Sequence, residues 1–152
     1  MTQDTKDSPI AVVDLPTQPG LYRLLSSSST VYYVDARGPY VPEMYRAHGA
    51  VGSASYPHDD TWVRLTSLES ICVSVDIDGK AVPQRRGLKD SEYWKLIVGR
   101  RHQFDFRVPG GYLDTTDFWR IQRVLERIER LDEMPPEGER TVEARVPHPP
   151  GA

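Results

Sequence analysis

The sequence has a single cysteine, Cys72, among its 152 residues, so an internal disulfide is excluded. No apolar run comes near the roughly 18 residues that a membrane-spanning helix needs. The opening residues, MTQDTKDSP, are polar and lack the basic start and apolar stretch of a secretory signal. We therefore expect a cytoplasmic protein that does not associate with membranes.

The common signatures of nucleotide and metal chemistry are also missing. Neither GxxxxGK[ST] nor GxGxxG occurs, and no GxSxG sequence surrounds a serine. The histidines lack HxxxH or HxH spacing, so we expect neither a metal nor a cofactor. A non-enzymatic role is favoured, and an enzyme with an unrecognised site is the weakest alternative. The residues considered for such a site are His58, Asp59, Asp60 and His102.

Charge is unevenly distributed along the chain, although the net formal charge is only −3. Residues 80–130 carry twelve Lys or Arg against seven Asp or Glu, whereas residues 1–79 carry five against ten. A basic segment of this kind can contact an anionic partner. Acidic segments of the same molecule can also neutralise it, and this second interpretation is favoured.

Proline, glycine and polar residues divide the chain into three parts. Residues 1–18 are predicted to be a flexible N-terminal tail, in which Ile10–Val13 could add an edge strand or stay loose. Residues 19–133 are predicted to form a single globular domain. Residues 134–152 contain five prolines and few large apolar groups, which predicts a disordered tail.

The first part of the domain is rich in β-forming residues. Strands are expected at residues 21–25, 31–34, 62–65, 67–77, 80–82, 93–98 and 104–108. The first two should form a hairpin, Asp78-Gly79 is typical of a hairpin turn, and the last two should pair with each other. Residues 36–60 are predicted to be a long loop, because glycine and proline interrupt them.

Residues 114–132 are predicted to form an amphipathic helix. At 100° per residue, one arc of the helix is apolar and would pack on the sheet; it holds Phe118, Ile121, Val124, Leu125, Ile128 and Leu131. A second arc holds Arg120, Arg123, Arg127 and Arg130, with Glu126 and Arg130 as a favourable i,i+4 pair. The fold class expected is therefore α+β: a small antiparallel β-sheet or partial barrel with one C-terminal amphipathic helix packed on it.

Three short stretches resemble a group of small β-rich proteins from actinobacteria and their phages. They are Tyr22-Arg23-Leu24 with Ser28 to Asp35, then Val63-Arg64-Leu65, then Thr115-Thr116. Members of that group are mostly of unknown function. The resemblance therefore implies an origin in actinobacteria or their phages and does not imply an activity. The present chain departs from it in its long central insertion and its predicted terminal helix.

We expect a non-enzymatic protein-interaction or structural domain, with an unidentified protein partner or self-association. Contact would come through the 36–60 loop, an exposed strand edge or the outer helix face. The alternative is a nucleic-acid-binding module that uses the basic 85–130 region. The candidate contact residues are Arg85, Arg86, Arg100, Arg101, Trp119, Arg120, Arg123, Arg127 and Arg130.

Overall fold

The computed structural model describes residues 9–49, 56–71, 74–75, 81–82, 92–107, 117–134 and 147. Within these residues the fold is all-β, and no helix occurs. The strands are β1 (Val12–Asp14), β2 (Leu21–Ser26), β3 (Val31–Asp35), β4 (Glu43–Ala47), β5 (Trp62–Ile71), β6 (Ser74–Val75), β7 (Ala81–Val82), β8 (Glu92–Tyr93), β9 (Lys95–Ile97), β10 (Arg101–Arg107), β11 (Asp117–Ile121) and β12 (Leu125–Leu131).

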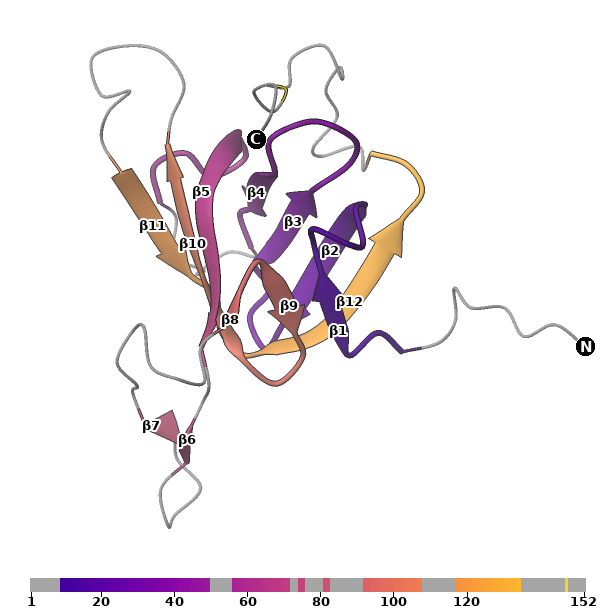
Figure 1. Ribbon diagram of the computed structural model, residues 1–152. Helices are drawn as coiled ribbons and strands as arrows, with labels where there is room; N and C mark the ends of the chain where they lie inside the picture. Colours follow the sequence, from indigo (N-terminus) through magenta and orange to yellow (C-terminus); the bar gives the residue numbers. More distant parts are fainter. Residues whose placement is uncertain are drawn as a thin grey trace, which may run out of the picture.

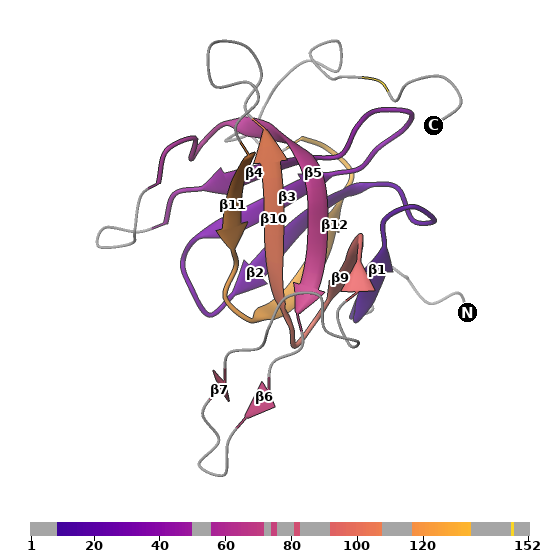
Figure 2. The ribbon, with the colours of Figure 1, turned by 60° about the vertical axis from the view of Figure 1, so that its left-hand side comes forward.

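Eight of the strands form one antiparallel sheet in the order β11-β10-β5-β4-β3-β2-β12, with β8 paired to β5. The sheet folds over into two layers, with β11, β10 and β5 in one and β4, β3, β2 and β12 in the other (Figure 1). Figure 2 shows the first layer in front of the second, whose strands cross behind it at an angle. Two separate pairs, β1 with β9 and β6 with β7, complete the structure.

The start of β12 is hydrogen-bonded to the turn that precedes β10. The amide of Gly99 donates to the carbonyl of Leu125 at 2.8 Å, and the amide of Leu125 donates to the carbonyl of Arg100 at 2.9 Å. The chain thus passes from β11, at one edge of the sheet, directly to β12, at the other edge. These bonds fix the separation of the two layers at this point.

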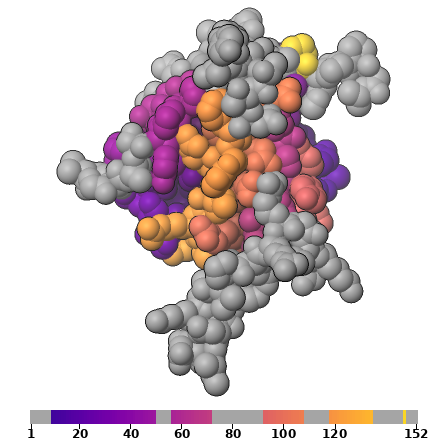
Figure 3. Space-filling view, turned by 90° about the vertical axis from the view of Figure 1, so that its left-hand side faces the viewer, coloured from indigo at the N-terminus to yellow at the C-terminus, as the bar shows by residue number. Residues whose placement is uncertain are grey.

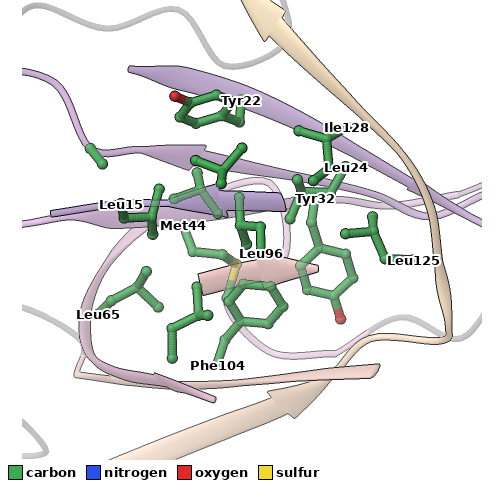
Figure 4. Packing of buried hydrophobic residues seen from close by; sticks show 14 of the residues in the cluster. Leu15, Tyr22, Leu24, Tyr32, Met44, Leu65, Leu96, Phe104, Leu125 and Ile128 are labelled. Carbon is green, nitrogen blue, oxygen red and sulfur yellow. The ribbon is translucent and has the colours of Figure 1, made fainter. Parts of the chain in front are cut away.

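The core lies between the layers (Figure 4). Leu24, Tyr32 and Met44 project from the second layer towards Leu65 and Phe104 of the first, and the rings of Tyr32 and Phe104 stack with centroids 5.0 Å apart. The β1–β9 pair adds buried residues from one side. These are Val13, Leu15 and Leu96.

The predicted hairpin of residues 21–25 and 31–34 is confirmed as β2 paired with β3. Its alternating pattern places Tyr22 and Leu24 in the core, as it does Tyr32 and Val34. Serine hydroxyls complete the turn: Ser26 Oγ accepts from the amide of Ser28, and Ser28 Oγ from the amide of Thr30. Short polar side chains suit such a turn because they satisfy amides that the ladder leaves unpaired.

The predicted helix at 114–132 is wrong, and with it the α+β class, although the β-rich character is confirmed. Residues 117–121 and 125–131 are the strands β11 and β12, and they pair with different partners, β10 and β2. Residues 114–116 lie outside the described residues. Glu126 and Arg130 are not turn neighbours; instead, Glu129 accepts a hydrogen bond from Arg23 across the strands at 2.7 Å.

A β-bulge explains why this segment has a helical periodicity. The pairing of β12 with β2 shifts between Leu125 and Arg127, so the inward residues Leu125 and Ile128 are three positions apart rather than two. A spacing of three is what one face of a helix shows. The remaining members of the apolar arc are not buried together, since Ile121 is 37% exposed.

Three other predictions also need correction. The 36–60 segment is not one loop, because residues 43–47 form β4 between β3 and β5. The expected pairing of 93–98 with 104–108 does not occur: β9 pairs with β1, and β10 pairs with β5 and β11. The two strands expected at 62–65 and 67–77 are instead one continuous strand, β5, followed by β6.

The Ile10–Val13 patch adds a strand to the fold, which is the first of the two alternatives expected from the sequence. Val12–Asp14 pair with Lys95–Ile97, and Ile10 forms a single bridge to Ile128. The turn residues Asp78-Gly79 lie outside the described residues, while β6 and β7 on either side of them pair antiparallel.

Candidate functional site

A buried arginine, Arg46 on β4, organises one end of the space between the layers. Its Nε donates to the hydroxyl of Tyr32 at 3.2 Å, and its Nη1 donates to Asp59 Oδ2. The Arg46 and Asp59 side chains are only 8% and 6% exposed. The amide of Tyr56 donates to the same Asp59 oxygen at 3.0 Å, which fixes residue 56 next to Arg46.

Tyr56 contacts two guanidinium groups. The Cζ of Arg46 is 4.7 Å from its ring centroid, and the Cζ of Arg120, on β11, is 4.9 Å away. Arg120 also lies over the ring of Phe106 at 5.5 Å. Each arginine therefore makes a cation–π contact with Tyr56, and such contacts strengthen where the cation is partly removed from water.

Arg120 is anchored by main-chain oxygens. It donates from Nη2 to the carbonyl of Pro57 at 2.7 Å and from Nη1 to that of Trp119 at 2.8 Å. No carboxylate of the described residues lies within ion-pair distance of it. Arg46 is neutralised by Asp59, so Arg120 contributes the uncompensated positive charge of this cluster.

Trp119 precedes Arg120 on β11, at one edge of the sheet. It is 59% exposed, the largest fraction among the exposed large hydrophobic side chains, and Tyr56 is 46% exposed. A hollow of about 410 Å³ is lined by Tyr56, Phe118, Trp119 and Arg120. Figure 3 shows this side of the molecule, where the orange atoms that include β11 lie between magenta and salmon ones.

His58 packs against the aromatic rings beneath this cluster. Its ring packs edge-on against Phe118 at 5.0 Å and against Phe106 at 6.5 Å. It takes a left-handed backbone conformation, with φ of 71°. Asp60 Oδ1 accepts from the amide of His48 at 3.1 Å, which holds the 56–61 segment against the end of β4.

Electrostatics keep Tyr32 and Arg46 each in one protonation state. Burial raises the pKa of Tyr32 more than the charge of Arg46 lowers it. Burial lowers the pKa of Arg46, but the hydrogen bond to Asp59 and the interactions with Tyr32 outweigh it, and the net shift is upward. Tyr32 is therefore a neutral phenol and Arg46 a permanent cation near neutral pH.

His102 is fully buried and far from His58 along β10. It lies four residues before Phe106, which His58 contacts, and four residues of a strand span about 13 Å. Its Nε2 accepts from the amide of Ile97 at 3.0 Å, so the neutral ring carries its proton on Nδ1. Burial, together with the charge of Arg100, lowers the pKa of His102 to about 3. The four residues considered for an enzyme site are thus not brought together.

The four arginines that were predicted to share one arc of a helix do not form one surface. Arg120 lies on β11, Arg127 and Arg130 on β12, and the two strands are opposite edges of the sheet. Arg127 Nε is 3.3 Å from Glu129 Oε2. Arg130 lies over the ring of Tyr22 and donates to the carbonyl of Pro19 at 3.2 Å. Arg123 is exposed between the two strands.

The other predicted basic residues have separate surroundings. Arg100 Nη1 is 3.3 Å from Glu92 Oε2, and Arg101 Nε donates to the carbonyl of Gln122 at 3.3 Å. Arg85 and Arg86 lie outside the described residues, as does Cys72. Of the seven candidate contact residues that the structure describes, only Trp119 and Arg120 lie at the hollow next to Tyr56.

Sequence reasoning did not find the role of Arg46 or Tyr32 beside Tyr56. The three lie in different segments, and only the pairing of β3 with β4 and the return of residues 56–61 bring them together. A weak signal was present, because Arg46 interrupts the apolar inner face of a short strand. A charged side chain on an inner face usually has a buried partner.

Comparison with protein-family models, with curated proteins and with solved structures finds no match. Among the residues that the structure describes, no three His, Cys, Asp or Glu side chains gather in a way that could hold a metal ion. That same part of the chain contains no helix long and apolar enough to cross a membrane.

Proposed function

We propose that the chain is a non-enzymatic protein-interaction domain that binds its partner through an aromatic–arginine surface, defined as Tyr56, Trp119 and Arg120. The observation that carries this proposal is the gathering of these three side chains around one hollow. Tryptophan, tyrosine and arginine are the residue types enriched at the energetic centres of protein interfaces. Each offers a large contact area and a polar end, so each can gain free energy when a partner covers it.

The surface is also held ready for binding. Arg120 is fixed by two main-chain carbonyls and the Tyr56 ring, and Tyr56 is fixed by Asp59. Binding then costs less side-chain entropy than it would with free rotamers. The uncompensated charge of Arg120 favours an acidic residue on the partner, because a guanidinium pairs well with a carboxylate.

Nucleic-acid binding is the second candidate, and one observation favours it: an exposed Trp119 can stack on a base. Two observations count against it. The ring of Tyr56 already makes cation–π contacts with two guanidinium groups, which compete with a stacked base. The arginines that would hold a phosphate backbone are spread over opposite edges of the sheet. We therefore favour a protein partner.

The proposal can be tested by site-specific crosslinking in the cells that produce the protein. A photo-crosslinking residue replaces Ile121, which is 37% exposed and two residues from Trp119. A defined adduct with another protein should form, and W119A or R120A should reduce it at least tenfold. Y93A is the matched control, because Tyr93 is an exposed aromatic (51%) on β8, and it should leave the adduct unchanged.

Two results would contradict the proposal. One is an adduct that W119A and Y93A weaken equally, since the contact would then not centre on the surface. The other is tight, Trp119-dependent binding of a fluorescently labelled single-stranded oligonucleotide that weakens steeply with salt. That second result would assign the surface to nucleic acid instead. Thermal unfolding of W119A should match that of the wild type, because an exposed side chain contributes little to stability.

A further inference from the structure

A second pocket, away from the aromatic–arginine surface, has a different chemistry. It has a volume of about 490 Å³ and a mostly apolar wall that includes Pro16, Pro19, Tyr40, Pro42 and Trp94. It lies next to the end of β3, where Ala36 and Gly38 line it, whereas Tyr32 of the first cluster is near the start of that strand. Aromatic and proline side chains together form the grooves that bind polyproline II segments.

The two aromatic walls of this pocket are held by unusual backbone. Trp94 has a φ of 59°, a left-handed conformation that is rare for a bulky residue. Its amide donates to the carbonyl of Leu68 at 2.8 Å, and its carbonyl accepts from the amide of Leu15 at 3.0 Å. Gly38 has a φ of 62°, and a Cβ there would lie 3.6 Å from the Tyr40 ring. Strain of this kind persists where the surroundings enforce it, and it often marks a ligand clamp.

The chain itself brings a proline to the rim of the pocket. Pro147 forms an antiparallel bridge with Tyr40, one of the two aromatic walls. His148, Pro149 and Pro150 follow it in the sequence and lie outside the described residues. In a polyproline II conformation three residues extend about 9 Å.

We propose that this pocket is a binding site for a polyproline II segment and that its occupant is the sequence His148-Pro149-Pro150 of the same chain. Proline rings pack flat against Trp and Tyr, and a proline-rich segment loses little conformational entropy on binding. The link through Pro147 gives this segment an effective concentration in the millimolar range, so even weak intrinsic affinity suffices. The site is independent of the aromatic–arginine surface and of the partner proposed for it.

The test uses the full-length chain and follows the indole N–H signals of Trp94 and Trp119 by NMR. In P149S/P150S the Trp94 signal should shift, while the Trp119 signal stays in place. The synthetic peptide VPHPPGA should then return the Trp94 signal towards its wild-type position at millimolar concentration. P135S/P136S is the matched control, since it removes two neighbouring prolines from another part of the chain, and it should leave Trp94 unchanged.

Three outcomes would overturn the proposal. An unchanged Trp94 signal in P149S/P150S would show that these prolines do not reach the pocket. Equal binding of the peptide by wild type and variant would show an open site, which assigns the pocket to a proline-rich segment of another protein. A Trp94 signal that depends on protein concentration in the wild type would assign it to a second copy of the chain. Y40A should weaken peptide binding by P149S/P150S at least fivefold, and its Trp119 signal reports whether the fold is retained.

Discussion

The buried histidine of β10 makes the stability of the fold depend on pH. His102 is neutral in the folded protein because its pKa is lowered to about 3. In the unfolded chain it takes up a proton below about pH 6.5. The unfolded state therefore binds more protons between these two values, and stability falls as the pH is lowered from 6.5 to 3.

The size of this effect follows from the two pKa values. A difference between about 6.5 and about 3 corresponds to about 5 kcal/mol once the pH is below both of them. Between pH 7.5 and pH 5 the loss is about 2 kcal/mol, and the slope there approaches about 1.4 kcal/mol per pH unit. Such a loss is a large share of the stability of a domain of this size.

Urea unfolding at pH 7.5, 6.5, 5.5 and 5 measures this dependence. In H102Q the amide oxygen can still accept from the Ile97 amide, but no group titrates there. The variant should be less stable at pH 7.5 and lose about 2 kcal/mol less than the wild type on going to pH 5. The difference between H102Q and the wild type isolates the contribution of His102, because every other titratable group is common to both proteins.

Identical pH profiles for H102Q and wild type would refute the reasoning, because the loss would then come from other groups. Should H102Q fail to fold, the ring signals of His102 in the wild type give the same answer by NMR. They should not titrate above pH 4, and a midpoint near 6.5 would show that the imidazole is accessible to protons.

Three further predictions concern stability. R46L leaves the Asp59 carboxylate buried without its cation, so it should lower the free energy of unfolding in urea by about 3–5 kcal/mol. R46L/D59N should recover part of this loss, and additive losses of the two single variants would contradict the pairing. L24A should cost about 3–4 kcal/mol because Leu24 is fully buried, while R127A should cost less than about 0.5 kcal/mol because its side chain is 69% exposed. R123P should cost about 1 kcal/mol or less, because residue 123 joins two strands; a loss of about 3 kcal/mol, as expected inside a helix, would contradict this.

The β2–β3 hairpin could be predicted because everything that specifies it is local. Tyr22, Leu24, Tyr32 and Val34 alternate with outward residues, and the serines between the strands suit a turn. The 125–131 segment could not be predicted in the same way. Its partner is β2, about a hundred residues earlier, and its bulge replaces a spacing of two by a spacing of three. Neither the pairing of β12 with β2 nor the bulge can be inferred from the local sequence.

The candidate site shows the same division. Trp119 and Arg120 were singled out from the sequence as contact residues, and the structure places both at the hollow, though on a strand rather than a helix. Arg46 was not found, since it belongs to no motif and its contact with Tyr56 depends on the pairing of β4 with its neighbours. The prediction that Arg120, Arg123, Arg127 and Arg130 share one surface was wrong because it assumed a helix.

The position of β12 has a consequence for how the chain is made. Arg23 and Glu129, which form an ion pair between β2 and β12, are 106 positions apart. At about 5–20 residues per second, synthesis takes roughly 5–20 s to pass from one to the other. During that time β2 has its β3 partner but not its β12 partner, and an open strand edge can pair with other chains. The nascent protein thus passes through a stage in which three of the four strands of its second layer have been made and the β2 edge of that layer is open, and this edge is covered only when β12 pairs with it.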